Sequence, residues 1–256
     1  MHQQNPAPLL LSHLLTDGAP VYPGDPCVRI RPALTLERNG VAVTALAFGS
    51  HAGTHVDAPA HTVPGGRTVD QLTHAELCGE ALVLGLAGVG PGEEIDADRI
   101  TALLDAATPV PVRVLLHTGW DAHWDAPAGP EREHRLRSHP HLSAEAAARL
   151  WDCGVRLLGT DCLSPDPTSP VPEAGDGFPV HALFLGRDGV LLENLAHLGA
   201  LRPEMTGAEK SSAEATDTTA DWRARVHLEV HPLPLAGADG APARVLARPH
   251  LRGGHR

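Results

Sequence analysis

Short apolar runs bounded by turn residues dominate the pattern of hydrophobic and polar positions along the chain. Residues 80–86 (EALVLGL) and 112–117 (VRVLLH) are apolar segments of strand length, which is typical of strands buried on both faces of a sheet. Residues 27–34 and 41–49 instead alternate and carry β-branched side chains, and Asn39-Gly40 between them is a hairpin signal. The pattern therefore predicts two buried strands and a hairpin.

Two further segments have the apolar spacing of an amphipathic helix. In residues 96–106 the apolar side chains recur on one helical face, and either Asp96 or Asp98 is placed to act as the N-cap. The segment from Ser143 to Gly154 has a residue that caps well at its start and a glycine where a helix commonly ends. Both segments are predicted to be helices.

The remaining chain alternates strands with these helices. Residues 155–159 (VRLLG) follow the second helix directly, and residues 224–230 and 243–248 form a final pair of strands. This alternation predicts an α/β domain. Residues 203–221 are polar and show neither the apolar spacing of a helix nor the alternation of a strand. We interpret them as a mobile excursion within a single domain that spans residues 1–256.

Composition narrows the class of protein. Of the 256 residues 42% are hydrophobic but only 3% are aromatic, so the core is expected to consist mainly of leucine, valine and alanine. The net charge is −11 and no basic stripe is present. We therefore expect neither nucleic acid nor an anionic membrane surface as a partner.

The cysteines and the chain start predict a cytoplasmic protein. The four cysteines are scattered without a CxxC pair, which argues against a disulfide framework and against a thiolate zinc site. The first residues lack the basic region of a signal peptide, and no apolar run approaches the roughly 18 residues of a membrane span.

Four side chains of the metal-binding type lie within eleven residues: His51, His55, Asp57 and His61. Imidazole and carboxylate together suit zinc, manganese or iron, and a carboxylate can bridge two ions. His55 and Asp57 are two residues apart, so in an extended segment both point to the same side. Any one of these histidines alone is more often a core or surface residue, but four such groups on one segment are hard to explain as packing.

The segment HAGTHVDAPAH (51–61) resembles the HxGTHxDxPxH signature of the cyclase-like metal hydrolases, which include bacterial kynurenine formamidase and isatin hydrolase. The resemblance implies a swivelling β/β/α domain around a mixed β-sheet, and a homodimer or homotetramer. Further segments similar to the family are PVYPGDP (20–26), LLHTGW (115–120), GVRLLGTDCLSPDP (154–167), His181 followed by LLEN (191–194), and PLPLAGADGAPARVLA (232–247).

Carried over by position, the resemblance assigns the site residues. It implies that His51, His55 and Asp57 bind one ion. A second ion would be held by Asp57, His181 and Glu193, with Asp57 bridging the two. Zinc is the favoured metal and manganese the alternative, with one or two ions in each chain. The resemblance also implies that His61 acts as the acid/base residue, and its imidazole is chemically suited to that task.

These assignments predict a metal-dependent hydrolase of a small-molecule amide carbon–nitrogen bond, with an N-formylkynurenine-type aryl formamide as the leading substrate. The alternatives are a lactam or lactone hydrolase, or a ring-forming cyclase of secondary metabolism. A non-catalytic metal-binding or ligand-binding protein is disfavoured because such a site needs no acid/base histidine. The aromatic residues expected to hold a substrate ring are Tyr22, Phe48, Trp120 and Trp124.

Two positions depart from what the resemblance to the formamidases implies. His117 stands where that family often has arginine, and Cys162-Leu163 stands where a smaller, more polar pair is common. If these side chains line the pocket, they alter its specificity. The choice among the substrates therefore stays open from the sequence.

Overall fold

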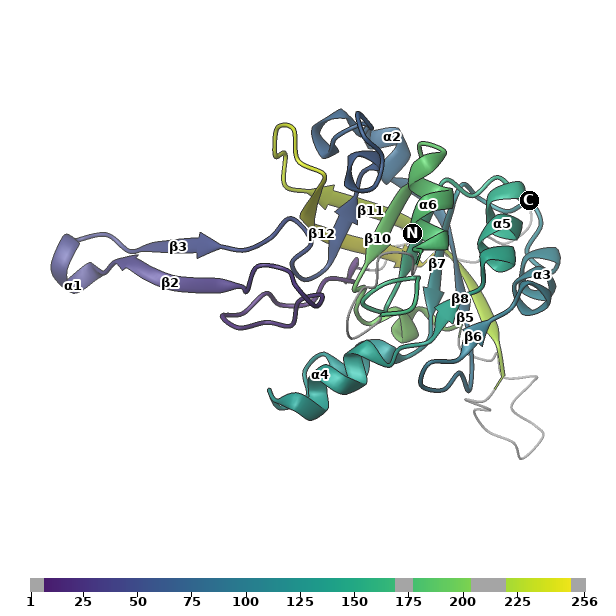
Figure 1. Ribbon diagram of the computed structural model, residues 1–256, viewed down its shortest axis with the longest axis horizontal. Coiled ribbons are helices and arrows are strands. Elements are labelled where there is room, and N and C mark those ends of the chain that lie inside the picture. Colours follow the sequence, from purple (N-terminus) through teal and green to yellow (C-terminus); the bar gives the residue numbers. More distant parts are fainter. Residues whose placement is uncertain (1–6, 169–176, 204–219, 250–256) are drawn as a thin grey trace, which may run out of the picture.

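The computed structural model describes residues 7–168, 177–203 and 220–249. Within these ranges, the strands of the main sheet are β1 (Leu9–Leu10), β4 (His55–Asp57), β5 (Gly79–Gly85), β7 (Arg113–His117), β9 (Leu157–Thr160), β10 (Val190–Glu193), β11 (Trp222–Pro232) and β12 (Gly240–Pro249). They lie in the order β1-β12-β11-β5-β7-β9-β10-β4. The helices that cover the sheet are α3 (Ala97–Asp105), α5 (Ala144–Asp152) and α6 (Pro179–Gly186) (Figure 1).

The main sheet closes on itself through its short strand β4. β4 pairs antiparallel with β10 on one side and with β12 on the other, so the strands from β12 round to β4 form a barrel-like ring. The central pairs β5–β7, β7–β9 and β9–β10 are parallel, whereas β11 and β12 pair antiparallel with their neighbours. The predicted α/β class and mixed sheet are confirmed.

The central strands are apolar on both faces because each face meets its own core. In β5, Leu82 and Leu84 pack with the helices, whereas Ala81 and Val83 belong to the cluster on the other face. Side chains alternate between faces along a strand, so a continuous apolar run is what two cores require. The buried strands predicted at 80–86 and 112–117 are confirmed as β5 and β7.

The predicted helices are confirmed together with their caps. Ser143 Oγ accepts a hydrogen bond from the Ala146 N–H at 3.0 Å, and Gly154 after the end of α5 has a φ of 93°. Of the two candidates for α3, Asp96 is the N-cap, and its Oδ1 accepts the Arg99 N–H at 2.8 Å. Each of these caps satisfies backbone groups that a helix end leaves without a partner.

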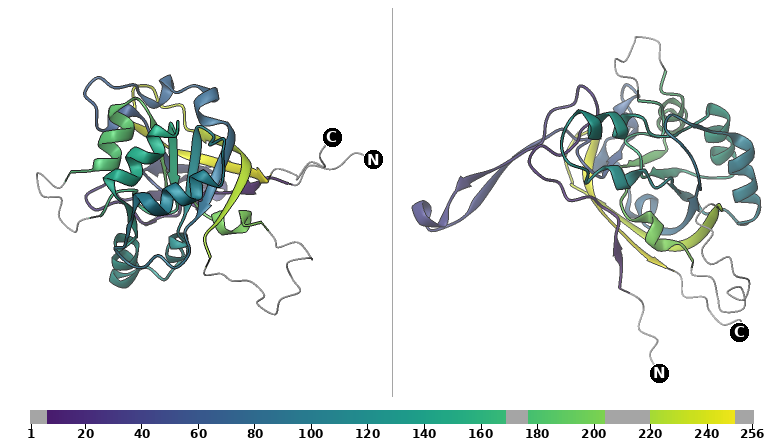
Figure 2. Two further views of the ribbon diagram at one scale, coloured as in Figure 1. Left: turned by 90° about the vertical axis from the view of Figure 1, so that its right-hand side faces the viewer. Right: turned by 90° about the horizontal axis from the view of Figure 1, so that it is seen from below.

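The predicted hairpin is also confirmed, and it extends away from the body of the protein (Figure 1, and the right-hand view of Figure 2). It consists of β2 (Arg29–Leu34) and β3 (Val43–Ala47). The chain reverses between the paired residues Leu34 and Val43, through a short helix, α1 (Leu36–Asn39), and not by a tight turn at Asn39-Gly40. Gly40 ends that helix in the left-handed conformation, with a φ of 70°.

The excursion predicted at 203–221 lies largely outside the described residues, which resume at Ala220. At the end of the predicted excursion, Asp221 accepts a hydrogen bond from the Ala87 N–H at 2.8 Å and pairs with Arg99.

None of the helices in the described part of the chain combines the length and the apolar character that crossing a bilayer requires.

One buried histidine should make the stability of this fold depend on pH. His139 lies just after α4 (Pro130–Arg137), donates Nδ1–H to the Pro140 carbonyl at 2.9 Å and accepts from the Thr168 hydroxyl at 2.7 Å. Burial lowers its pKa from 6.5 to about 4. Its contribution to stability is therefore fully present above pH 6.5 and is lost as the pH falls through 4.

We expect His139→Gln to remove this dependence. Between pH 7 and pH 4.5 the wild-type free energy of unfolding should fall by about 2 to 3 kcal/mol more than that of the variant. Urea denaturation at both pH values measures the difference. The exposed His74→Gln is the matched control and should retain the wild-type dependence. Equal pH dependence in wild type and His139→Gln would show that His139 is not held neutral by burial.

Candidate metal centre

The centre is built on β4, the strand that closes the ring. His55 and Asp57 point to one side of it and Val56 points into the opposite apolar cluster, as the period of a strand requires. His55 and Asp57 are fully buried. His55 Nε2 lies 3.2 Å from Asp57 Oδ1. The geometry inferred from the spacing of two residues is therefore present.

Turns on either side of β4 bring in the other two histidines of the motif. Gly53 has a φ of 66°, and the 3₁₀ helix Pro59–His61 follows β4. His51 Nδ1 consequently lies 2.7 Å from Asp57 Oδ1, and the rings of His51 and His61 have centroids 4.0 Å apart. The motif segment itself therefore supplies the turns, at Gly53 and Pro59.

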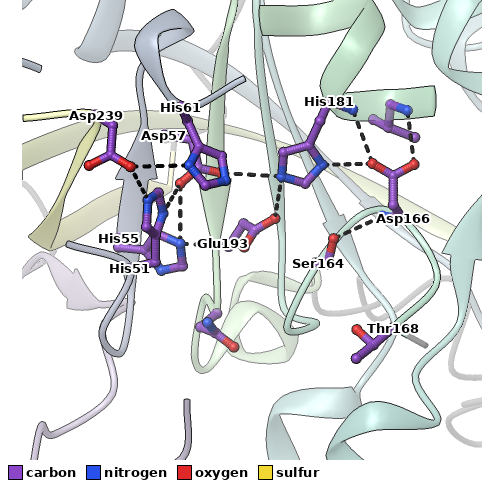
Figure 3. Close-up of polar contacts among 12 residues, drawn as sticks. His51, His55, Asp57, His61, Ser164, Asp166, Thr168, His181, Glu193 and Asp239 are labelled. Carbon is purple, nitrogen blue, oxygen red and sulfur yellow. Dashed lines mark hydrogen bonds and ion pairs between the residues drawn. The ribbon is translucent and has the colours of Figure 1, made fainter. Parts of the chain in front are cut away.

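Residues distant in sequence reach the centre because β10 pairs with β4. Glu193 at the end of β10 stands opposite His55 in the ladder, and its Oε2 lies 3.4 Å from His55 Nε2. His181 comes from α6, with its Nε2 3.4 Å from Glu193 Oε1 and 3.5 Å from Asp57 Oδ2 (Figure 3). The structure thus places His181 and Glu193 beside Asp57.

The donor atoms fit a divalent metal ion. His55 Nε2, Asp57 Oδ2 and Glu193 Oε1 are buried without a hydrogen-bond partner, which is costly unless another group binds them. Ligands about 2.0 to 2.2 Å from a tetrahedrally bound zinc ion lie roughly 3.3 to 3.6 Å from one another. The contacts of 3.2 to 3.5 Å among His55, Asp57, His181 and Glu193 fall close to that separation. His51 Nδ1 is instead 2.7 Å from Asp57 Oδ1, a hydrogen-bond distance.

Outer hydrogen bonds turn the correct nitrogens toward the centre. His55 donates Nδ1–H to the Gly53 carbonyl at 2.8 Å, and His181 donates Nδ1–H to Asp166 Oδ2 at 2.6 Å. Asp166 also accepts the backbone N–H groups of Val180 and His181 at the start of α6. Both imidazoles therefore present Nε2 to the centre. Histidine ligands in metal sites are commonly oriented in this way by a hydrogen bond from the other ring nitrogen.

The carboxylates of the centre favour the binding of a cation. Burial alone would lower the pKa of His181, but hydrogen bonds to Asp166 and Asp57 raise it to about 10. Burial would raise the pKa of Asp57, yet His55 and the neighbouring histidines hold it well below its usual range. Without an ion the carboxylates therefore keep protons on the imidazoles, and a divalent ion would replace those protons.

Sequence reasoning assigned no role to Asp166 or to Asp239. Asp239 lies immediately before β12, and its Oδ2 accepts from His51 Nε2 at 2.9 Å and from His61 Nδ1 at 3.2 Å. The segments containing both aspartates are among those that resemble the family. The signal that identifies their roles, contact with a particular histidine, exists only in the folded chain.

A cavity of about 350 Å³ opens on the centre. Of the aromatic residues predicted to bind substrate, Tyr22 lines it, whereas Phe48, Trp120 and Trp124 do not. Phe178, just before α6, lines it instead. Besides Tyr22 and Phe178, the lining residues are Pro23, Asp25, His51, His55, His61, Thr62, Leu163, Ser164, His181, Glu193 and Asn194.

The three other aromatic side chains have packing partners elsewhere. Phe48 packs against the apolar cluster that contains Val28. Trp120 donates its indole N–H to the Arg135 carbonyl at 2.9 Å, and Trp124 stacks on His13 with ring centroids 4.4 Å apart. These contacts account for the burial of the two tryptophans without a substrate.

Of the positions that depart from the formamidase pattern, Leu163 lines the cavity, and His117 and Cys162 do not. His117 packs against Trp222 and lies with Asp121 and Asp161 in a second group of metal-type side chains among the described residues. Asp161 uses both carboxylate oxygens to accept backbone N–H groups at 118 and 119, at 2.8 to 3.1 Å. That carboxylate anchors the loop after β7.

Comparison with known proteins identifies a family model and relatives that resemble this chain. A family model described as a putative cyclase matches residues 9–167. Kynurenine formamidase of Paracidovorax citrulli (strain AAC00-1) is 31% identical over 221 residues, which cover 77% of this chain and 90% of that protein.

Two solved structures share the fold. An isatin hydrolase bound to the product analogue thioisatinate has a TM-score of 0.73 at 20% identity, covering 94% of this chain and 91% of that one. A potential metal-dependent hydrolase with cyclase activity has a TM-score of 0.67 at 24% identity, covering 96% and 98%.

Proposed function

Because the chain belongs to the putative cyclase family, we propose that it is a metal-dependent hydrolase that cleaves a carbon–nitrogen bond of a small molecule, with an N-formylkynurenine-type aryl formamide as the leading substrate. The family predicted from HAGTHVDAPAH is confirmed. The kynurenine formamidase relative bears out the prediction of an enzyme that hydrolyses amide bonds. Three converging buried donor atoms without partners, beside His61, are the observation that carries the proposal.

The proposed ligands form two sets that share Asp57. His51, His55 and Asp57 would hold one ion, and Asp57, His181 and Glu193 a second. We favour zinc over manganese because imidazole and carboxylate donors at these separations suit tetrahedral zinc. A bound divalent ion would polarise the substrate carbonyl and lower the pKa of water toward neutrality.

His61 supplies the proton transfer. Its Nδ1–H is held by Asp239, so Nε2 carries the lone pair that can accept a proton from the attacking water. As the water oxygen bonds to the carbonyl carbon and the carbon–nitrogen bond breaks, the same proton passes to the leaving nitrogen. The exposed position of His61 on the cavity lining lets it reach both atoms.

The cavity walls favour a small aromatic substrate. Tyr22, Phe178 and Leu163 supply ring and apolar surface, which suits an aniline-type ring. Lysine and arginine are absent from the described lining residues. A neighbouring cavity of about 280 Å³ shares Tyr22 and Leu163, and the acidic Asp25 and Glu133 line it together with Arg29, Arg132 and Arg137. A substrate carboxylate that extends past Tyr22 would meet these guanidinium groups, which supports an amino acid derivative.

Metal analysis followed by a substrate panel tests this function. We expect the purified protein to contain a divalent ion and to hydrolyse aryl formamides, to lose activity on chelation, and to regain it with zinc or manganese. Hydrolysis of lactones but not of formamides would replace the substrate class and leave the chemistry intact. Absence of both bound metal and hydrolysis would overturn the proposal.

We further propose that the chain is a homo-oligomer joined through the β2–β3 hairpin. Leu36, Val43 and Leu46 are 46 to 65% exposed, and an isolated two-stranded hairpin is marginal in water. Residues 27–49 carry three arginines and one glutamate, a net charge of +2, whereas the whole chain carries −11. An apolar and basic arm is complementary to the acidic body of a second copy.

Leu46→Asp should weaken this association, because a carboxylate would be buried without a partner. We expect the dissociation constant to rise at least about tenfold, which is roughly 1.4 kcal/mol. Light scattering across a concentration series measures it and distinguishes a dimer from a tetramer. Leu14→Asp, at an exposed leucine outside the hairpin, is the matched control. A wild-type protein that is monomeric at every concentration would contradict the proposal.

The cysteines support the predicted cytoplasmic location. All four are free thiols, as is usual in a reducing compartment. The location itself stays a prediction.

A further inference from the structure

Closure of the main sheet into a ring places Asp239 beside His51 and His61. Gly240, the first residue of β12, pairs with Asp57, and the Asp239 carbonyl accepts the Ala58 N–H at 2.9 Å. A Cβ atom on Gly240 would lie 2.7 Å from the Val56 carbonyl oxygen and 2.9 Å from His51 Cε1. The absence of a side chain at Gly240 therefore allows β12 to approach β4 closely enough for Asp239 to reach the histidines.

One carboxylate oxygen connects two functional groups. Asp239 Oδ2 accepts from His51 Nε2 at 2.9 Å and from His61 Nδ1 at 3.2 Å (Figure 3). Its Oδ1 accepts from the Ser50 hydroxyl at 2.9 Å. A carboxylate accepts hydrogen bonds and donates none, so each imidazole nitrogen that contacts Asp239 carries a hydrogen.

These hydrogen bonds select the tautomers that the reaction needs. Because Asp239 holds the Nε2–H of His51, the nitrogen that His51 would present to an ion is Nδ1, whose hydrogen is donated to Asp57 Oδ1 at 2.7 Å until an ion replaces it. With Nδ1 protonated, His61 keeps the Nε2 lone pair for proton transfer. An imidazole of the opposite tautomer would present N–H where a lone pair is required.

We propose that Asp239 is a positioning residue for both histidines, holding His51 in the form that binds the ion and His61 in the form that accepts a proton. This inference rests on the proposed function. The Asp239 side chain is 41% exposed, and its hydrogen bonds go to Ser50, His51 and His61. The backbone carbonyl, and not the carboxylate, makes the contact that holds the strand ends together.

A double-mutant cycle tests the link to His61. We expect Asp239→Ala to lower kcat by about 10- to 100-fold at saturating metal, with KM changed by less than about threefold. In a His61→Ala background the same substitution should change kcat by less than about threefold, because the group it positions is already gone. Full additivity of the two losses, or an unchanged kcat in Asp239→Ala, would overturn the proposal.

Asp70→Ala is the matched control for movement of the loop before β12. Asp70 lies in the 3₁₀ helix Val69–Gln71, and its Oδ1 accepts the Gly237 N–H of that loop at 3.1 Å. If the kcat loss in Asp239→Ala arose only from movement of the loop, Asp70→Ala would reproduce it. We expect Asp70→Ala to remain within about twofold of wild type, as surface substitutions away from a site usually do.

Two readouts do not depend on turnover. Long-range ¹H–¹⁵N NMR of the metal-free protein should report Nδ1–H on His61 in wild type and a mixture of tautomers in Asp239→Ala. Competition with a chelator should show zinc affinity lowered by about tenfold in the variant. If wild type binds no metal and hydrolyses nothing, the proposed function fails, and the NMR comparison still decides the role of Asp239. Unchanged tautomers in Asp239→Ala would overturn it.

Discussion

Replacing Asp57 with asparagine is expected to abolish metal binding and to lower kcat/KM by at least about 10³-fold, roughly 4 kcal/mol of transition-state stabilisation. Among the described residues, Asp57 is the one carboxylate that contacts His51, His55 and His181, at 2.7 to 3.5 Å, and it is fully buried. An amide in its place removes the negative charge shared by both halves of the centre. Metal content by mass spectrometry and initial rates on an aryl formamide measure the loss.

The controls separate loss of the site from loss of the fold. Asp188→Asn removes a carboxylate that pairs with Arg67 at the surface and should retain both metal and activity. Glu193→Gln removes a ligand proposed for one ion only, so one equivalent of metal should remain if the chain binds two. Circular dichroism checks that each variant is folded. A folded Asp57→Asn protein with its full metal content would contradict the assignment.

Replacing His61 with alanine is expected to lower kcat by about 10²- to 10⁴-fold while the metal content stays at the wild-type level. His61 is exposed on the cavity lining and its side chain hydrogen-bonds to Asp239, outside the set of proposed ligands. Its removal therefore takes away the proton carrier without emptying the centre. Rates at saturating metal, together with metal analysis, test the result.

His61→Gln sharpens this experiment, because its amide N–H can still donate to Asp239 but cannot carry a proton through the reaction. We expect it to lose as much activity as His61→Ala. His227→Ala, at an exposed position of β11, is the control for removing an imidazole and should remain near wild type. Substantial activity in His61→Gln would show that His61 serves only to orient other groups.

Local structure was predictable where all the residues that determine it lie within one segment. The cap at Ser143 and the glycine at 154 lie within the helix segment that they delimit, and the predicted helix is confirmed as α5. The apolar run at 80–86 predicted a strand buried on both faces without reference to its neighbours. In each case the governing interactions connect residues a few positions apart, so the spacing along the chain is sufficient.

The pocket shows where composition misleads. Phe48, Trp120 and Trp124 are aromatic and near the motif segments in sequence, yet the folded chain places them outside the cavity lining. Phe178 lines the cavity because α6 begins beside it. Aromatic side chains serve packing and binding equally well, and only the surrounding elements decide between the two uses.

The sequence alone determined one half of the centre, His51, His55, Asp57 and His61, because turns and strand periodicity act within eleven residues. Resemblance added His181 and Glu193, which spacing does not connect to that segment. The tertiary structure decided how the halves meet, since β4 pairs with β10 on one side and β12 on the other. It also revealed Asp166, which meets His181 15 residues further on, and Asp239, which meets His51 188 residues away. Both contacts depend on strand pairing and helix placement, which are set by the whole packed sheet.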